Sequence, residues 1–325
     1  MPDMPSYADI ESAARRLDGK AVVTPLLESP RLNDTLGGRL LVKPECLQLT
    51  GSFKFRGAYN RISGGATGNG VVAYSSGNHA QGVAAAASML GQPAVIVMPD
   101  DAPAIKMAGT RAWGADIVTY SRHDESREEI AGSVARQSDM TIVPPYDDPM
   151  IIAGQGTAGL EIADACDRRD IIPDAVITCC GGGGLTAGVA LAISHRFPGC
   201  AIHTAEPEGW DDTARSLLSG RRQSVTDTPA SICDALLART PGQLTFDINR
   251  NLVHSGTVVT ESAVIGAMVT ALESFKLVVE PGGAVALASA ISGMVPVKGR
   301  TVVAVISGGN VDADVYADLV ARGRS

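Results

Sequence analysis

Aromatic residues and basic clusters are scarce in this sequence of 325 residues. Phe, Trp and Tyr make up 4% of the chain, and the formal charge is −8 with no run of Lys and Arg. Proteins that bind nucleic acid need clustered basic residues. The composition therefore predicts no nucleic-acid partner and favours a small molecule as the ligand.

Long apolar segments are absent as well. No run approaches the ~18 apolar residues that a membrane helix requires. Residues 1–20 carry Asp3, Asp9 and Glu11 and lack the apolar core of a signal peptide. We therefore expect a cytoplasmic protein that makes no membrane contact.

Cysteines in metal-binding spacing are also missing. Cys179 and Cys180 are adjacent, and the other four, Cys46, Cys166, Cys200 and Cys233, stand alone. Isolated cysteines in a cytoplasmic protein are usually buried, reduced thiols, and we expect that state here.

Short β-rich runs alternate with helical patterns along the chain. With 45% hydrophobic residues and 36 glycines, this order is typical of an α/β protein built from βαβ units and parallel sheets. The expected strands are 39–44, 71–75, 94–98, 115–120, 141–143, 175–180, 201–206 and 301–307. The expected helices are 80–90, 103–113, 124–137, 185–197 and a last one from about Asp312.

The alternation predicts two doubly wound sheets, the smaller inserted into the larger. Residues 68–147 would form a small mobile domain, and residues 1–67 and 148–325 the large one. The segment Pro144–Pro149, rich in proline and aspartate, is the expected hinge.

Three glycine-containing loops follow expected strands, at Ser75–His79, Gly181–Leu185 and Ser307–Asn310. Ligands of α/β sheets bind beyond the carboxyl ends of strands. Four consecutive glycines allow backbone N–H groups to approach an anion, and the next helix adds its positive N-terminus. Residues 181–184 are therefore the best candidate for a phosphate-binding loop.

The same loop supports a different interpretation. Residues 182–187 fit the pattern G-x-G-x-x-A, and Glu206 lies 24 residues after Gly182. This is the dinucleotide-binding fingerprint with its acidic residue. Taken alone, the segment predicts a nicotinamide-dependent dehydrogenase.

Lys54 stands between Phe53 and Phe55, behind an expected helix N-cap at Ser52. Apolar neighbours and a nearby cation, Arg56, disfavour the charged ammonium. A neutral amine is the form that makes an imine with a carbonyl. The segment therefore indicates a lysine with a chemical role.

Residues 51–57, Gly-Ser-Phe-Lys-Phe-Arg-Gly, resemble the S-x-K-x-R-G signature of fold-type II pyridoxal-phosphate (PLP) enzymes, in the branch of threonine/serine dehydratases and serine racemases. Further motifs of this family follow in order over nearly the whole chain: Ser75–His79, Ile151–Gly156, Gly181–Gly184, Glu280–Gly283 and Ser307–Asn310. The ordered set outweighs the dehydrogenase interpretation. The resemblance implies the tryptophan synthase β-like fold, with two doubly wound parallel-sheet domains and the cofactor between them, in a homodimer.

The resemblance also implies the roles of individual residues. Lys54 would form the Schiff base with PLP, Phe53 would pack beside the pyridine ring, and Asn78 would hydrogen-bond the ring hydroxyl. Gly181, Gly182, Gly183 and Gly184 would hold the phosphate, and Ser307 would bond the pyridine nitrogen. Ser75, Ser76, Asn78 and His79 would take the substrate carboxylate, with Ser76 as the acid/base on the ring face opposite Lys54.

A cation site is implied near Glu206. Residues 206–212, Glu-Pro-Glu-Gly-Trp-Asp-Asp, resemble the cation motif of serine racemases, which would hold Mg²⁺ or Ca²⁺ through Glu206, the Trp210 carbonyl and Asp212. Oxygen ligands of this kind suit a hard cation. The alternative is that Asp211 or Asp212 only caps the following helix.

The expected reaction is dehydration of a small β-hydroxy amino acid to a 2-oxo acid and ammonia. L-Threonine and L-serine are the default substrates. 3-Hydroxyaspartate is an alternative because Arg127 could meet a second carboxylate, and serine racemisation is another. Tyr146 stands where the racemases of the family have asparagine, so we expect elimination to dominate over racemisation.

Overall fold

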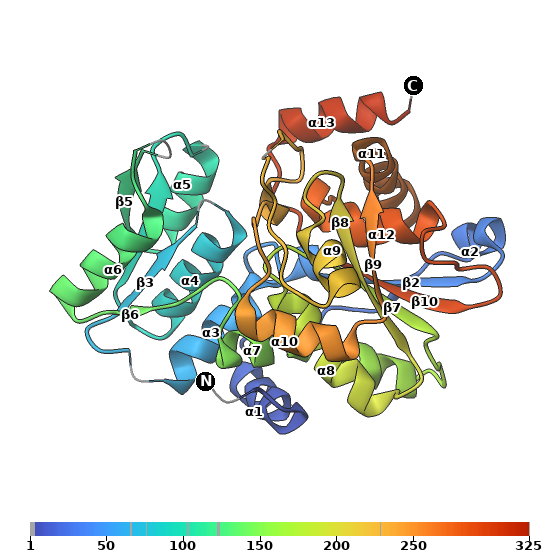
Figure 1. The fold of residues 1–325 in the computed structure, drawn as a ribbon, viewed down its shortest axis with the longest axis horizontal. Coiled ribbons are helices and arrows are strands. Elements are labelled where there is room, and N and C mark those ends of the chain that lie inside the picture. Colours follow the sequence, from blue (N-terminus) through green and yellow to red (C-terminus); the bar gives the residue numbers. More distant parts are fainter. Residues whose placement is uncertain are drawn as a thin grey trace.

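Two β-sheets organise the molecule (Figure 1). The computed structural model describes residues 4–65, 67–75, 77–102, 104–121, 124–227 and 229–324. None of the helices in these ranges combines the length and the apolarity needed to cross a membrane.

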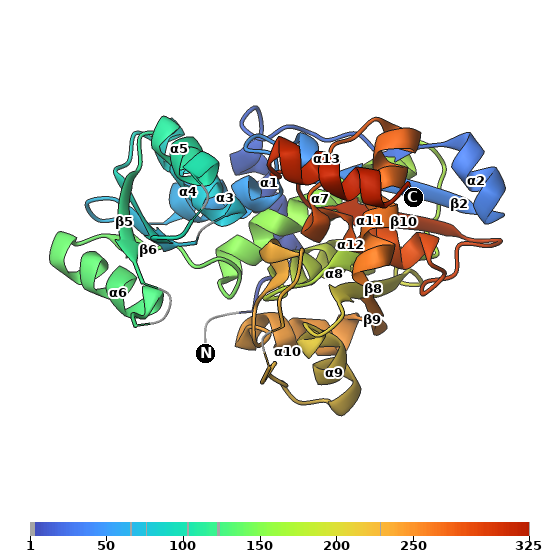
Figure 2. The ribbon, with the colours of Figure 1, turned by 90° about the horizontal axis from the view of Figure 1, so that it is seen from above.

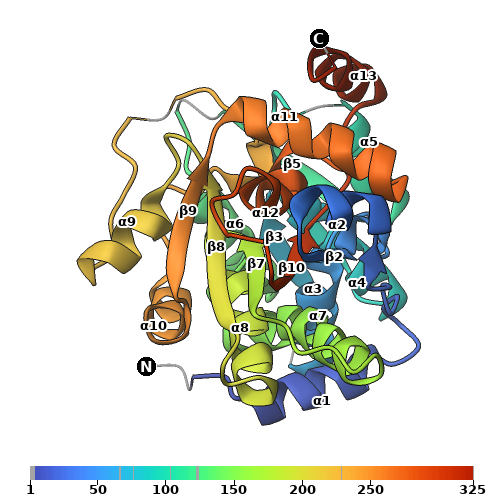
Figure 3. The same ribbon diagram turned by 90° about the vertical axis from the view of Figure 1, so that its right-hand side faces the viewer.

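The larger sheet has the strand order β1-β2-β10-β7-β8-β9, and Figure 3 shows its central strands side by side. Its strands are β1 (Leu27–Glu28), β2 (Arg39–Pro44), β10 (Thr301–Ile306), β7 (Ala175–Cys179), β8 (Ala201–Pro207) and β9 (Ser255–Val259). All neighbours pair in parallel except β1 and β2. β7 is buried along its whole length, as expected of a parallel strand covered on both faces.

Helices cover both faces of this sheet (Figures 1 and 3). On one face lie α1 (Tyr7–Leu17), α7 (Pro149–Asp167), α8 (Gly184–Arg196) and α10 (Gln243–Leu252). On the other lie α11 (Glu261–Thr270), its π-helical extension η3 (Ala271–Phe275) and α12 (Pro281–Ile291). The periphery holds α2 (Pro30–Leu36), η1 (Glu45–Leu47), α9 (Asp212–Ser219), η2 (Asp234–Leu236) and α13 (Ala313–Arg322).

The smaller sheet has the order β5-β4-β3-β6, with every pair parallel. Its strands are β3 (Val71–Tyr74), β4 (Ala94–Pro99), β5 (Asp116–Tyr120) and β6 (Thr141–Ile142), and its helices are α4 (Asn78–Met89), α5 (Ala104–Ala112) and α6 (Arg127–Ser138). Figure 2 shows this unit standing to one side of the larger one. Its core is continuous with Phe55, Ala58 and Tyr59 of α3 (Lys54–Gly64). The predicted domain boundaries stay a prediction.

Helix α7 lies between α3 and α8 and touches both through glycines. A methyl group on Gly154 of α7 would lie 2.6 Å from the Cα atom of Gly57 in α3. A methyl group on Gly188 of α8 would overlap the carbonyl of Ile152 and lie 2.8 Å from the Cα atom of Gly156. Backbone therefore packs on backbone across all three helices.

The predicted fold class is confirmed. Each strand and helix expected from the sequence is present, with ends that differ by no more than three residues. Several elements of the large unit were not predicted, among them α7, α10, α11, α12 and β9.

Candidate active site

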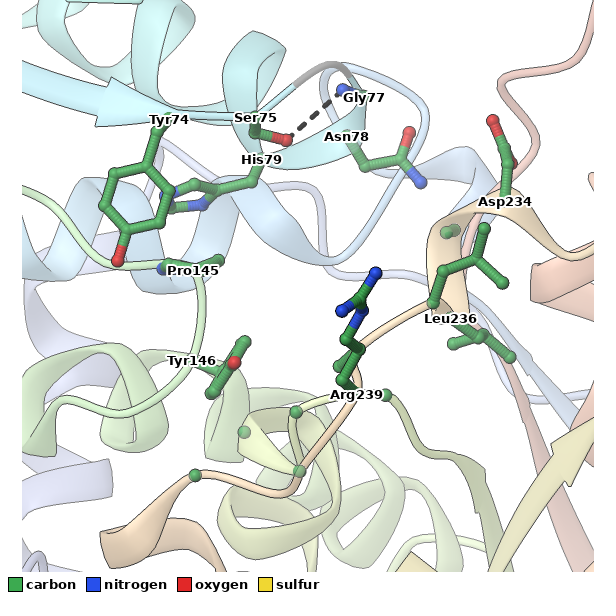
Figure 4. A pocket seen from close by; sticks show the side chains of 18 of the residues that line it. Tyr74, Ser75, Gly77, Asn78, His79, Pro145, Tyr146, Asp234, Leu236 and Arg239 are labelled. Carbon is green, nitrogen blue, oxygen red and sulfur yellow. Dashed lines mark hydrogen bonds between the residues drawn. The ribbon is translucent and has the colours of Figure 1, made fainter. Parts of the chain in front are cut away.

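A cavity of about 1220 Å³ lies between the two sheet units. Its wall comes from the carboxyl ends of strands and the loops that follow them, which is where α/β sheets bind ligands. The described residues that line it include Phe53, Lys54, Ser75, Asn78, His79, Gly181, Gly182, Gly183, Gly184 and Ser307. The structure thus gathers the predicted cofactor and substrate residues that it describes, all but Ser76, around one pocket, which we call the central pocket (Figure 4).

Lys54 is the first residue of α3, and its Nζ atom donates to the carbonyl oxygen of Pro145 at 2.7 Å. Burial lowers the pKa of Lys54 to about 8. The sequence interpretation was wrong about the cap, because Phe53 and not Ser52 is the N-cap residue. Ser52 instead forms a β-bridge with Gly308, which fixes the chain just before Lys54 against the end of β10.

Arg56 does not act on Lys54 as the sequence suggested. Its guanidinium donates to Glu45 at 2.7 Å and to Glu161 at 2.6 Å, so its charge is already balanced. Lys43 contacts the same Glu161 at 2.5 Å. Desolvation, rather than a neighbouring cation, is therefore the cause of the lowered pKa of Lys54. The buried ion cluster of Lys43, Glu45, Arg56 and Glu161 anchors α3 to β2 and α7.

The glycine loop joins β7 to α8. Gly183 has φ +94°, in the left-handed region that favours glycine, and it is the N-cap of α8. Because this N-cap has no side chain, the first N–H groups of α8 are left open to an anion. The carbonyl of Gly182 accepts from Thr245 Oγ1 at 2.7 Å and from the Gly242 N–H at 3.1 Å, which holds the loop in place.

The loop after β3 contributes the opposite wall. Asn78 begins α4 and donates to Glu280 Oε1 at 2.6 Å, while Asn310 Nδ2 donates to the Asn78 side-chain oxygen at 2.7 Å. Burial raises the pKa of Glu280 to about 8. Ser76, the expected acid/base, lies outside the described residues.

His79 has a structural environment. Its Nε2 atom contacts the carbonyl of Val143 at 2.9 Å, and burial lowers its pKa to about 3. The ring is neutral, so its contact with the carbonyl makes Nε2 the donor. His79 therefore ties the start of α4 to the chain that follows β6.

Ser307 and Cys179 lie at the ends of the adjacent strands β10 and β7 and line the same pocket. The Ser307 carbonyl accepts from the Phe53 N–H at 3.2 Å. Burial raises the pKa of Cys179 to about 11, so the group beside Ser307 is a neutral thiol. All six cysteines are free, and five are buried while Cys46 is partly buried.

The expected cation residues form a separate, buried acidic pair. Both oxygens of Glu206 accept N–H groups at the start of α9, from Thr213 at 2.9 Å and Ala214 at 2.7 Å. Asp212 Oδ2 is buried and has no hydrogen-bond partner in the described chain. Burial, then repulsion from Asp212, raises the pKa of Glu206, and burial raises the pKa of Asp212 to about 7.

These contacts correct the alternative interpretation, in which Asp211 or Asp212 only caps the helix that follows. Asp211 is the N-cap of α9, but its side chain caps no N–H group and pairs with Arg215 at 3.2 Å instead. Glu206 satisfies the helix start from a neighbouring strand. No group of three His, Cys, Asp or Glu side chains that could hold a metal occurs in the described ranges, which leaves two carboxylates and a carbonyl as the candidate ligands.

Sequence reasoning missed three residues of the central pocket. Glu280 received no role, although it holds Asn78, and Tyr74 and Arg239 were not considered. Arg239 belongs to no motif and lies outside any predicted element. Only the folded chain brings it beside the glycine loop.

Comparison with known proteins identifies the family. The family model described as pyridoxal-phosphate dependent enzyme matches residues 18–308. This chain is a member of that family. It belongs to the fold-type II branch of dehydratases and racemases, which confirms the resemblance seen in the sequence.

Three relatives of this PLP enzyme show the range of the branch. An L-threo-3-hydroxyaspartate ammonia-lyase from Pseudomonas sp is 42% identical over 97% of this chain and 98% of its own length. A serine racemase from Schizosaccharomyces pombe is 37% identical over 98% of both chains. The crystal structure of the T.th. threonine deaminase is 41% identical, with a TM-score of 0.91 over 95% of this chain and 99% of that one.

The central pocket fits PLP on its own geometry. It offers an amine with a lowered pKa at Lys54, uncapped N–H groups at the start of α8 and a hydroxyl at Ser307. These groups match the aldehyde, the phosphate and the ring nitrogen of the cofactor. The family assignment thus replaces the dehydrogenase interpretation of the glycine loop.

Proposed function

We propose that this PLP enzyme is an ammonia-lyase that removes water from a small β-hydroxy amino acid, giving a 2-oxo acid and ammonia. The observation that carries the proposal is the buried amine of Lys54, with a pKa of about 8, in a pocket that also presents the glycine loop and Ser75, Asn78 and His79. A neutral amine at this position can take the α-proton of the substrate.

Bound PLP would supply an electron sink for the negative charge that develops at the α-carbon. Lys54 would hold it and exchange the α-proton, the start of α8 would bind its phosphate, and Phe53, Asn78 and Ser307 would orient its ring. A serine hydroxyl beside the ring nitrogen would leave that nitrogen unprotonated and would make the sink weak. This weakness suits a substrate whose β-hydroxyl leaves, because the departing group takes up the charge.

We further propose that the substrate carries a second carboxylate, so that the enzyme prefers 3-hydroxyaspartate over L-serine and L-threonine. Besides Lys54, the cations Lys106, Arg127, Arg222 and Arg239 line the central pocket. Acidic residues of the same lining balance part of this charge, since Lys106 contacts Asp234 and Arg127 contacts Glu128, but Arg239 has no acidic partner among the described residues and could meet a second carboxylate. The name of the Pseudomonas relative supports the same substrate class.

Elimination should dominate over racemisation. The ring of Tyr146 packs so closely on Gly182 that a methyl group on this glycine would overlap it. We expect this aromatic wall beside the glycine loop to narrow the region of the β-substituent and to exclude water from it. Ser76 is the proposed acid/base of the opposite face.

We also propose that Mg²⁺ or Ca²⁺ binds at Glu206, Asp212 and the Trp210 carbonyl. Both carboxylates have raised pKa values, and one buried oxygen of Asp212 lacks a partner among the described residues. A cation would satisfy that oxygen and relieve the repulsion. We expect a structural ion and a homodimeric, cytoplasmic enzyme.

The proposed function is tested by product analysis. Purified holoenzyme is incubated with L-threo-3-hydroxyaspartate, L-serine and L-threonine, and 2-oxo acid, ammonia and D-isomers are measured. We expect oxo acid and ammonia in equal amounts, with 3-hydroxyaspartate fastest. D-serine accumulating ahead of pyruvate would make the protein a racemase, and absence of oxo acid from all three substrates would refute the proposal.

A further inference from the structure

The loop that follows η2 covers the central pocket and is held at several points. Leu236 is buried in the large core, and the Arg239 carbonyl accepts from the Val225 N–H at 2.8 Å. Three residues after Arg239, the Gly242 N–H donates to the carbonyl of Gly182. The backbone of Arg239 is therefore fixed relative to the glycine loop.

The Arg239 side chain projects from this loop into the pocket, toward the space between Asn78 and Tyr146 (Figure 4). Ser75 and Asn78, the proposed site of the α-carboxylate, lie across that space from it. A substrate bound there would extend its β-substituent away from Ser75 and Asn78. The guanidinium stands on the side of the pocket where that substituent would arrive.

The other cations of the pocket already have acceptors. Lys106 contacts Asp234 at 2.5 Å, Arg127 contacts Glu128 at 2.8 Å, and Arg222 donates to the Pro241 carbonyl at 2.9 Å. For the Arg239 guanidinium, the described part of the chain provides no hydrogen-bond acceptor or ion-pair partner. Arg239 is exposed, so a guanidinium whose backbone is fixed and whose side chain lacks a protein partner is open to an anionic ligand.

We propose that Arg239 is the specificity-determining residue that binds the second carboxylate of the substrate. The inference rests on the proposed ammonia-lyase function and adds the residue that selects the substrate. A guanidinium binds a carboxylate through two parallel hydrogen bonds, which adds geometric selectivity to the charge attraction. Serine and threonine lack this carboxylate and gain no contact with the exposed guanidinium, so the residue favours the dicarboxylic substrate over them.

Arg239 could instead meet the phosphate of PLP, because the glycine loop is close by. The two roles differ in what a substitution would change. Loss of a phosphate ligand weakens cofactor binding and lowers turnover of every substrate alike. Loss of a substrate ligand changes the ratio between dicarboxylic and monocarboxylic substrates and leaves the cofactor bound.

The test compares wild type, Arg239→Met and Arg239→Lys with Arg221→Met, which removes an equal charge from an exposed residue outside the pocket lining. In Arg239→Met, kcat/KM for L-threo-3-hydroxyaspartate should fall about 100-fold, as expected for one member of a hydrogen-bonded charge pair. L-Serine turnover should stay the same or rise. Arg239→Lys should recover part of the loss, and Arg221→Met should behave as wild type on both substrates.

Binding without turnover gives a second readout. L-Aspartate has both carboxylates but no leaving hydroxyl, and L-alanine lacks the second carboxylate. Titration of the holoenzyme with each, followed by the cofactor absorbance, should show weaker L-aspartate binding in Arg239→Met and unchanged L-alanine binding. PLP affinity, measured by the same absorbance, should not change.

Equal losses on both substrates, or a weaker affinity for PLP, would overturn the assignment of Arg239. An enzyme that eliminates water from L-serine but neither binds L-aspartate nor converts 3-hydroxyaspartate would also overturn it, while the ammonia-lyase function would stand. Absence of turnover with every substrate, together with normal L-aspartate binding that Arg239→Met weakens, would uphold Arg239 as the carboxylate ligand and refute the lyase function.

Discussion

At Lys54 the protein holds an amine where its charged form is poorly solvated. Arg56, two residues away, has its charge balanced by Glu45 and Glu161, so it contributes no repulsion. The nearest acceptor is the neutral carbonyl of Pro145. The reactivity of this lysine therefore depends on burial, which a single substitution elsewhere in the pocket would alter only slightly.

The pH dependence of cofactor attachment tests this cause. Imine formation requires the neutral amine, so the rate of PLP attachment to apoprotein should rise about tenfold per pH unit below the pKa of Lys54. The rate should level off above a pH of about 8, whereas the rate for an ordinary lysine would keep rising up to its pKa of 10.5. Stopped-flow absorbance at a series of pH values measures the profile.

Borohydride provides the control for the site. It should fix the cofactor to the peptide that contains Lys54, in wild type and in Lys298→Ala, where the removed lysine is exposed. Lys54→Ala should show neither fixation nor turnover. A rate still rising well beyond pH 9 would contradict the lowered pKa.

At the scale of single elements, the start of α9 combines a helix cap with a buried acidic pair. Without a cation, the raised pKa values of Glu206 and Asp212 mean that the folded state favours the protonated carboxyls. This contribution to stability is complete below the unfolded pKa near 4 and is lost as the pH rises through about 7. A bound cation would remove that loss.

Chelator should therefore lower the melting temperature more at pH 8 than at pH 5.5. Stabilisation by a ligand at 100 times its Kd is about 2.7 kcal/mol, which corresponds to several degrees in a chain of this size. Glu206→Gln should abolish the difference between chelator and added Mg²⁺ or Ca²⁺, while Glu208→Gln, at an exposed neighbour, should keep it. A melting temperature that changes with neither chelator nor added metal at pH 8 would contradict a cation site.

Elements that alternate Val- or Ile-rich strands with alanine-rich helices were predicted from the sequence, because their burial follows from local composition. Helix α7 was not, because Gly154, Gly156 and Gly159 disfavour a helix locally. The contacts of Gly154 with Gly57 and of Gly156 with Gly188 compensate for that cost, and such contacts exist only in the folded molecule. Helix α9 was predicted, but its cap was not, since Glu206 comes from a neighbouring strand.

The residues of the site also divide into those that the sequence predicts and those that only the folded molecule brings together. Lys54, Ser307 and the glycine loop belong to contiguous motifs and could be recognised from the sequence. Glu280 lies in such a motif too, yet its contact with Asn78 spans 202 positions of the chain. Arg239 has no motif at all, so only the positions of η2 and Gly182 reveal it.

At the scale of the whole molecule, few polar side-chain contacts of the described residues join the two sheet units across the central pocket. Lys106 on α5 contacts Asp234 on η2 at 2.5 Å, and Asn78 contacts Glu280 and Asn310. The contact of Lys106 with Asp234 is weak because the Asp234 side chain is exposed, and surface ion pairs contribute about 0–1 kcal/mol. These polar contacts therefore offer little resistance to motion of the small unit, whereas the apolar core that it shares with α3 ties its base to the large unit.

We predict that residues 68–147 rotate as a rigid body when substrate binds, which would exclude water from the site. Asp147 accepts from the Thr245 N–H and Asp148 from the Met150 N–H, so both are fixed to helices of the large unit. The moving part should therefore end at a hinge in residues 144–146, just before the predicted boundary at residue 147. Crystal structures with and without L-aspartate measure the rotation, and superposable structures with an occupied site would contradict it.

The three-helix contact through glycines sets a dimension of the active site. Helix α3 carries Lys54 at its start, and α8 begins at the phosphate loop; α7 separates them by the thickness of a bare backbone. An added methyl group at Gly57, Gly154 or Gly188 would push the lysine away from the phosphate loop, although none of these residues lines the central pocket. A displacement of about 1 Å can reduce a rate about 100-fold. The tolerance of this enzyme to mutation should therefore be narrow at these glycines, which have no side chain and lie outside the pocket whose chemistry they protect.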